Sequence, residues 1–257
     1  MSYAIFPSLV DKSVVVTGGG TGIGAAIVEA FCAQGARVFF LDIADADSEA
    51  LAERLRDGRH RPAFHHCDLR DIASIERVFA AICTEAGKID ILVNNAANDD
   101  RHPFGSIAPA YWDERIAVNL RHQFFCAQYA AAGMKAAGHG VILNFGSISW
   151  HVALANLSIY MTAKAGIEGM TRGLARELGP YGIRVNAIIP GAVRTPRQMK
   201  LWQSPDSEAK LVADQCLPER VEPEHVARMA LFLASDDGSR CSGREYFVDA
   251  GWYGASS

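Results

Sequence analysis

Short runs of apolar residues, many of them β-branched, recur along the chain, and longer segments with helical periodicity separate them. We predict strands at 14–17, 37–41, 63–67, 89–93, 141–145, 183–189 and 245–248. Strands that are buried on both faces of a parallel sheet are continuous apolar runs of this kind, and segments such as 72–86 and 162–178 are long enough to be crossover helices. The alternation predicts an α/β fold, a Rossmann-type doubly wound parallel sheet of about seven strands with helices on both faces.

Residues 194–218 break this alternation, just before a last helix that we predict to begin near Pro223. Their Pro, Gln, Ser and Lys content is typical of an irregular segment. We interpret it as a substrate lid, and an ordinary surface connection is the alternative. The sequence contains no internal repeat and no low-complexity linker. A chain of 257 residues is within the range of single-unit α/β folds, so we expect one dinucleotide-binding and catalytic domain over residues 1–257.

Composition and charge exclude several classes of protein. Hydrophobic residues make up 49% of the chain and charged residues 21%, which suits a covered sheet and not a disordered chain. The formal net charge is −4, with no run of Lys or Arg that could neutralise successive phosphates, so nucleic acid is not an expected partner.

The cysteines and the first residues bear on the compartment. The six cysteines form no C-x-x-C pair and no metal-ligand spacing, which favours free thiols, no metal site and a reducing compartment. Residues 1–10 have no secretion-signal pattern, and no apolar run reaches the roughly 20 residues of a membrane helix. We therefore expect a soluble, cytoplasmic protein with no membrane partner.

A glycine-rich sequence joins the first predicted strand to a helix. Residues 17–24 are Thr-Gly-Gly-Gly-Thr-Gly-Ile-Gly, and glycines at such a junction let the backbone turn and approach a pyrophosphate at the positive end of the helix. Asp42 follows the second strand, eighteen residues beyond Gly24, where an acid can bond the adenosine ribose hydroxyls and would repel a 2′-phosphate. No Lys or Arg lies within 18–24 or at 43 and 44, so the pattern predicts NAD and not NADP.

Further motifs follow the glycine-rich sequence: Asn94-Asn95-Ala96, Asn119, Ser147, Tyr160, Lys164 and Pro190-Gly191. In this order and at these spacings the chain resembles the short-chain dehydrogenase/reductase family over essentially its whole length. The resemblance implies the following cofactor-binding residues: Gly18, Thr21, Gly22, Ile23, Gly24, Asp42, Asp68, Leu69, Asn94, Asn95, Ala96, Tyr160, Lys164, Pro190, Gly191, Val193 and Thr195. The family usually has glycine where this chain has Ala97, which leaves the local backbone angle open.

Tyr160 and Lys164 are four residues apart in a predicted helix, so both side chains project from one face. A free tyrosine has a pKa of about 10, and a nearby ammonium is expected to lower the pKa of the Tyr160 phenol toward neutrality, as a general base requires. Ser147 follows the strand at 141–145, at the carboxyl end where open α/β sheets bind ligands, and can hold the substrate oxygen. The family resemblance adds Asn119, as the residue that holds a water between the lysine and solvent, and a bond from Lys164 to the nicotinamide ribose.

Polar residues near the catalytic group indicate the substrate class. The predicted substrate contacts are Asn98, Ser147, Ser149, His151, Asn156, Tyr160 and Gln198. Amides and hydroxyls beside a broad aromatic face suit a polyhydroxylated ring, whereas a fatty-acyl or steroid pocket would call for an apolar lining. For His151 a structural role is the alternative. Within the family, residues 98–102, 111–116, 119–122 and 146–151 resemble the bacterial NAD-dependent aldose 1-dehydrogenases, the D-xylose and D-galactose enzymes among them.

This resemblance implies oxidation of the anomeric C1 hydroxyl of an aldopyranose to the lactone, with NAD as acceptor. Reduction of a 3-oxoacyl thioester is the enzymatic alternative, and Asp42 disfavours it because those relatives mostly use NADPH. An NAD-responsive interaction protein without catalysis is an alternative of another class, although it would not need Ser147, Tyr160 and Lys164. The segments 119–133 and 160–178 are apolar around much of their circumference, and the family resemblance implies a homotetramer.

Overall fold

All seven predicted strands occur, and they form one parallel sheet in the order β3-β2-β1-β4-β5-β6-β7. The computed structural model describes residues 3–202 and 204–254. The strands are β1 Ser13–Thr17, β2 Arg37–Asp42, β3 Ala63–His66, β4 Ile91–Asn94, β5 Gly140–Phe145, β6 Ile183–Pro190 and β7 Glu245–Val248. The predicted fold class is confirmed, and the strand order reverses between β1 and β4, which is the switch point of a doubly wound sheet.

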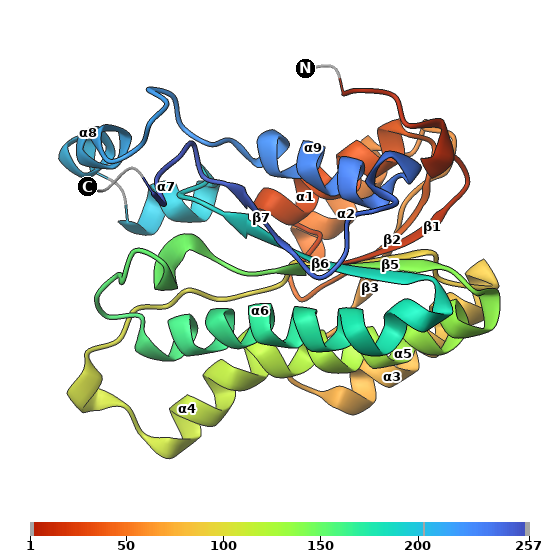
Figure 1. Cartoon of the computed structure of the whole chain (residues 1–257), viewed down its shortest axis with the longest axis horizontal. Coiled ribbons are helices and arrows are strands. Elements are labelled where there is room, and N and C mark those ends of the chain that lie inside the picture. The colour runs from red at the N-terminus through yellow and green to blue at the C-terminus, as the bar shows by residue number, and fades with distance from the viewer. Residues whose placement is uncertain (1–2, 203, 255–257) are drawn as a thin grey trace.

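Helices cover both faces of the sheet (Figure 1). The helices are α1 Gly22–Ala33, α2 Asp45–Arg54, α3 Ile72–Ala86, α4 Pro109–Ile116, α5 His122–Ala137, α6 Ser158–Leu178, α7 Pro196–Trp202, α8 Pro205–Ala213 and α9 Pro223–Ala234. In Figure 1, α1 and α9 lie on one side of the strands, and α3, α5 and α6 lie on the other. Within the described ranges, no helix combines the length and apolarity that crossing a membrane requires.

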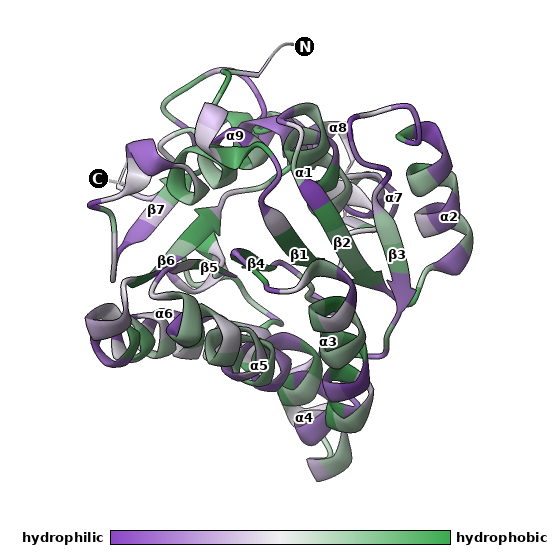
Figure 2. Cartoon of the chain, turned by 90° about the vertical axis from the view of Figure 1, so that its right-hand side faces the viewer, coloured by the Kyte–Doolittle hydropathy of each residue, from purple (hydrophilic) through white to green (hydrophobic). Residues whose placement is uncertain are grey.

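Two hydrophobic cores separate the sheet from these helical layers, and the strands alternate between them. In β1, Val14 and Val16 belong to the core under α1 and α9, whereas Val15 belongs to the core under α3 and α5. This is the two-residue period of a strand whose two faces are both covered, and it is why the strand sequences are continuous apolar runs. Figure 2 shows β1 and β2 coloured as hydrophobic between the helical layers.

Residues 194–218 are more regular than the sequence predicts, because they contain α7 and α8. A proline begins each of these helices, at the position where a helix needs no backbone N–H donor. Ser204 adds a capping box with Ser207 at the start of α8. The prolines therefore start helices here. Figure 1 places α7 and α8 beyond the edge at which the sheet's β6 ends.

A buried polar chain joins the centre of the sheet to α6. The Nδ2 atom of Asn94 donates to Oδ1 of Asn144 at 3.0 Å, and Nδ2 of Asn144 donates to the hydroxyl of Thr171 at 3.0 Å. All three side chains are fully buried. The family resemblance places Asn94 along the cofactor, but its side chain points into this inner network, while the neighbouring Asn95 faces the glycine-rich turn.

We expect Asn144→Leu to lower the free energy of unfolding by about 1–3 kcal/mol, because it leaves the Thr171 hydroxyl and part of the Asn94 amide buried without partners. Urea denaturation at constant slope measures the loss. Thr171→Ser keeps the hydroxyl and serves as the control, with a smaller loss. An Asn144→Leu variant as stable as the parent would contradict this account of the network.

Candidate functional site

The turn between β1 and α1 is shaped for a close backbone approach. Gly18 and Gly22 have positive φ angles of 64° and 55°, which favour glycine. A Cβ on Gly24 would lie 1.8 Å from the carbonyl oxygen of Gly18, so no larger residue fits there. Thr21 precedes α1 in an extended conformation and its side chain does not cap the helix. The first N–H groups of α1 are therefore available to an anionic ligand.

Asp42 ends β2 beside this turn. Its Oδ2 accepts from the backbone N–H of Gly20 at 2.9 Å, and its Oδ1 accepts from those of Ile43 and Ala44 at 2.8 and 3.0 Å. Three backbone donors fix the carboxylate at the edge of the glycine-rich turn, where a ribose diol would meet it.

Asn95 and Ala96 close the other side of the turn. Nδ2 of Asn95 donates to the carbonyl oxygens of Thr17 and Gly18, and the backbone N–H groups of Asn95 and Ala96 donate to the Thr17 hydroxyl. Ala97 follows with no positive φ, so the alanine that departs from the family pattern adopts an ordinary backbone conformation.

The remaining predicted cofactor residues lie along the same edge of the sheet. Pro190 ends β6, Gly191 follows it, and the side chain of Thr195 lies where a Cβ on Gly22 would contact it at 3.4 Å. Asp68 follows β3 and pairs with Arg70. The side chains of Leu69 and Val193 are buried in the cores, which leaves only their backbone for a ligand. The glycine cradle and the fixed acid fit a dinucleotide.

Tyr160 and Lys164 lie one turn apart at the start of α6, as the sequence predicts. The Nζ atom of Lys164 is 5.5 Å from the centroid of the Tyr160 ring and donates to the carbonyl oxygen of Phe145 at 2.7 Å. Ser147 hydrogen-bonds to the phenol of Tyr160, which brings the three predicted residues together at the end of β5. Ser147 itself caps a short helical turn, since its Oγ accepts from the N–H of Ser149.

Burial dominates the titration of this pair. Desolvation raises the pKa of Tyr160 above its ordinary value, the charge of Asp99 adds to the rise, and the hydrogen bond from Ser147 opposes it. Desolvation also lowers the pKa of Lys164 to about 7, against the opposing effect of Asp99. The sequence predicts that the lysine lowers the pKa of the tyrosine. In the protein without cofactor this effect is absent, because burial favours the uncharged form of Lys164, which supplies no positive charge to the phenol.

Asn119 lies where α4 runs into α5 through a π-helical turn, Ala117–Arg121. Its Nδ2 donates to the carbonyl oxygens of Arg115 and Asn98, each at 3.0 Å, and its Oδ1 accepts from the N–H of Asn98 at 2.8 Å. Wide turns of this kind are frequent at functional sites. The fully buried Asn119 thus connects the loop after β4 to the end of α4 by hydrogen bonds.

The loop 98–102 faces α7. Gln198 donates from Nε2 to Oδ2 of Asp99 at 2.6 Å, and Arg197 donates to Asp99 and to Asn98. Asp99 and Arg197 were not predicted as site residues. Asp99 is adjacent to the predicted Asn98, but Arg197 is 98 residues away, and no local pattern links the two.

The three remaining substrate candidates are in different surroundings. Ser149 is buried, and its Oγ has no hydrogen-bond partner among the described residues. Asn156 is exposed with a φ of 62°, and its carbonyl oxygen accepts from the N–H of His102. His151 is directed at the buried Glu168, with 3.0 Å between Nε2 and Oε1, and packs against Trp150, which is the arrangement of a structural histidine.

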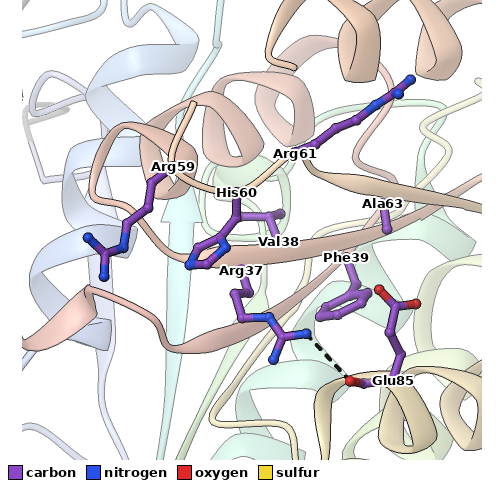
Figure 3. Close-up of a pocket in the computed structure, with 8 residues that line it drawn as sticks. All are labelled: Arg37, Val38, Phe39, Arg59, His60, Arg61, Ala63 and Glu85. Carbon is purple, nitrogen blue, oxygen red and sulfur yellow. Dashed lines mark hydrogen bonds between the residues drawn. The ribbon is translucent and has the colours of Figure 1, made fainter. Parts of the chain in front are cut away.

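A pocket of about 280 Å³ lies at the opposite edge of the sheet (Figure 3). Arg37, the first residue of β2, and Arg59, His60 and Arg61, which precede β3, line it. Their polar groups already have partners: Asp11 for Arg59 and His60, Glu53 for Arg61, and the carbonyl oxygen of Glu85 for Arg37. The pocket shares no residue with the glycine-rich turn or the catalytic group, so it is not part of the candidate site.

Comparisons with known proteins find relatives that match nearly the whole chain. A family model described as enoyl-(acyl carrier protein) reductase matches residues 18–253. The chain is 58% identical to D-xylose 1-dehydrogenase of Caulobacter vibrioides, over 98% of this chain and 100% of the relative. It is 43% identical to the "Probable galactose dehydrogenase GalD" of Rhizobium meliloti, over 96% of each chain. A solved structure described as a short chain dehydrogenase/reductase family protein has a TM-score of 0.84 at 32% identity, covering 96% of this chain and 99% of that one.

The lowered pKa of Lys164 predicts a pH-dependent stability for the protein without cofactor. Between pH 7 and about 10 the unfolded lysine holds a proton that the folded one has lost, so folding is favoured as the pH rises. The free energy of unfolding should rise, relative to that of Lys164→Met, by about 1 kcal/mol per pH unit in this window. Urea denaturation at pH 7, 8 and 9 measures it. The variant Lys210→Met, at an exposed position, is the control, and a difference for Lys164→Met that does not change with pH would refute the assignment.

Proposed function

Because the chain belongs to the short-chain dehydrogenase/reductase family, we propose that it oxidises the anomeric C1 hydroxyl of an aldopyranose to the lactone with NAD as the hydride acceptor. The observation that carries the proposal is the Ser147–Tyr160–Lys164 group at the end of β5, in a chain 58% identical over its length to a D-xylose 1-dehydrogenase. D-xylose, D-galactose and their configurational relatives are the proposed substrates.

The residues of the catalytic group divide the reaction between them. Tyr160 takes the proton of the C1 hydroxyl, while Ser147 hydrogen-bonds to the same oxygen and holds it against the phenol. Lys164, whose Nζ donates to the carbonyl oxygen of Phe145, would bond the nicotinamide ribose and orient it, and Asn119 keeps the adjoining loop in place. Bound NAD would supply the hydride acceptor for C1 and a positive charge that favours the phenolate of Tyr160 over the phenol.

Burial around Tyr160 makes its deprotonation the costly step. Since desolvation and Asp99 both raise the pKa of the phenol, oxidation gains from alkaline pH and from any positive charge placed beside the ring. The reverse reaction, carbonyl reduction, needs the protonated phenol and gains from lower pH. The same site therefore catalyses both directions, with pH setting the balance.

Polar groups around the reacting carbon suit a sugar. The buried hydroxyl of Ser149 has no partner among the described residues, and Asn98 and Gln198 lie where the loop 98–102 meets α7. A site built to bond hydroxyls rejects analogues without them, because its polar groups are then left unpaired. We assign substrate contacts to Asn98, Ser149, Asn156 and Gln198, and the lid role to 194–218.

NAD is the proposed cofactor because of Asp42. Its carboxylate is fixed by three backbone N–H groups, so it cannot easily turn away from a 2′-phosphate, and residues 43 and 44 supply no compensating cation. The family membership also supports a homotetramer. Exposed aromatic side chains such as Phe124 on α5 offer apolar surface to a second copy of the chain.

The substrate assignment predicts NADH production from aldoses and little from simple secondary alcohols or 3-hydroxyacyl thioesters. Absorbance of the reduced nicotinamide follows the reaction, and hydroxylamine traps the lactone. Tyr160→Phe serves as the control, because it removes the proton acceptor and should reduce turnover by roughly a hundredfold or more with NAD affinity near normal. Activity confined to thioesters would replace the sugar assignment by the acyl one. Binding of NAD with no turnover of any substrate would favour an NAD-responsive interaction protein.

The cofactor assignment predicts that Asp42→Ala weakens NAD about tenfold to a hundredfold while NADP binds at least as well as before. The two effects differ because the ribose bonds are lost for NAD, whereas the repulsion of the 2′-phosphate is relieved for NADP. Fluorescence titration with both cofactors measures them. Equal weakening of both would mean that Asp42 acts only by ordering Gly20, and better turnover with NADP in the unmodified protein would overturn the assignment.

A further inference from the structure

Asp99 lies in the loop 98–102, which contacts both α7 and the start of α6. It belongs to the loop that follows β4, and this loop is fixed one residue earlier by the paired hydrogen bonds of Asn98 and Asn119. From α7, Arg197 donates to Oδ1 at 3.2 Å and Gln198 donates to Oδ2 at 2.6 Å. The side chain of Asp99 is 21% exposed, so a ligand can still reach it.

The charge of Asp99 acts on both members of the catalytic pair. It is the charged group that contributes to the pKa shifts of Tyr160 and of Lys164, and it raises both. The loop 98–102 also contacts the start of α6, since the N–H of His102 donates to the carbonyl oxygen of Asn156 at 2.9 Å and its Nε2 lies 3.4 Å from the Ser158 hydroxyl. These contacts bring the loop that carries Asp99 to the end of α6 at which Tyr160 and Lys164 lie. Two further titratable groups are linked to these residues: Arg197 on α7 pairs with Asp99, and the buried His122 on α5, whose pKa desolvation and Lys164 lower to about 3, is neutral.

A carboxylate has about four lone-pair positions, and in Asp99 the hydrogen bonds from Arg197 and Gln198 of α7 use two of them. A polyol held against Ser147 and Tyr160, at the start of α6, would lie beside the loop that carries this carboxylate. Charged acceptors form hydrogen bonds roughly twice as strong as neutral ones, so a carboxylate in this position discriminates strongly among hydroxyl patterns.

We propose that Asp99 is a specificity-determining residue of the active site, whose carboxylate accepts a hydrogen bond from one ring hydroxyl of the sugar while Arg197 and Gln198 hold it in place. The proposal rests on the proposed aldose oxidation and deepens it. It makes the contact between the loop 98–102 and α7 part of substrate recognition, since the two α7 side chains orient the acceptor.

Asp100 provides a matched control. It has the same charge and is the next residue, but its side chain is 46% exposed and its carboxylate pairs with Arg115 and Arg197. It contributes to the pKa shift of neither Tyr160 nor Lys164. Loss of charge at position 100 therefore tests for general weakening of the loop, whereas loss at position 99 tests for contact with substrate.

The experiment compares Asp99→Asn and Asp100→Asn on the best aldose and on its 2-, 3- and 4-deoxy analogues. We expect Asp99→Asn to reduce kcat/KM for the parent aldose by about tenfold to a hundredfold, and to cause no further loss on the one analogue that lacks the hydroxyl bound by Asp99. The pH profile supplies a second readout. Removing the negative charge lowers the pKa of Tyr160, so the rising limb of kcat/KM for oxidation should move to lower pH in Asp99→Asn and stay in place in Asp100→Asn.

An equal loss on the parent and on every deoxy analogue, or identical profiles for the two variants, would overturn the role of Asp99 while aldose oxidation by the unmodified protein stands. Silence of the unmodified protein on every aldose would overturn the proposed function, and the role of Asp99 with it. If Asp99→Asn does not fold, as judged by its melting temperature and NAD binding, Asp99→Glu replaces it. That variant keeps the charge and displaces the oxygens, and it should lose the discrimination among deoxy analogues.

Discussion

The site depends on the reversal of strand order between β1 and β4, and hydrogen bonds between Thr17 and Asn95 hold the ends of these two strands together. Parallel strands on the two sides of such a switch point leave a crevice at their carboxyl ends, because the following connections turn to opposite faces of the sheet. The glycine-rich turn follows β1 and Ser147 follows β5, so the switch point between β1 and β4 lies between them in the sheet. The side chain of Asn95 donates to the carbonyl oxygens of Thr17 and Gly18, so the glycine-rich turn and the loop after β4 are fixed to each other.

Burial shifts the pKa values of Tyr160 and Lys164 in opposite directions for one physical reason. The low-dielectric surroundings disfavour every charged form, so they raise the pKa of the Tyr160 phenol and lower that of the Lys164 ammonium. Because both side chains favour their uncharged forms, a charged ligand that binds beside them changes the pKa of each. The fully buried Asn119 keeps this environment rigid, since its amide satisfies both backbone groups of Asn98 and one carbonyl of the helix that carries it.

A chain of ion pairs surrounds the outer side of the site and runs through Asp68, Arg70, Glu114, Arg115, Asp100 and Arg197. Exposed pairs of this kind contribute little singly, but Arg115 is largely buried, which keeps the geometry of its two partners fixed. The chain links the end of β3 to α4, to the loop 98–102 and to α7. The segments that we propose to border the substrate are therefore held to one another as well as to the sheet.

The sequence alone determined the strands, the helix at 72–86, the glycine-rich turn with Asp42, and the approach of Tyr160 to Lys164, because each follows from a local period or from spacing within one element. Tertiary structure decided the rest. Prolines that interrupt the sequence pattern begin α7 and α8. His151 contacts Glu168, and Asp99 pairs with Arg197, which is 98 residues away in the sequence. The pKa of Tyr160 moved opposite to expectation because desolvation depends on how all surrounding elements pack, and a spacing of four residues carries no information about that.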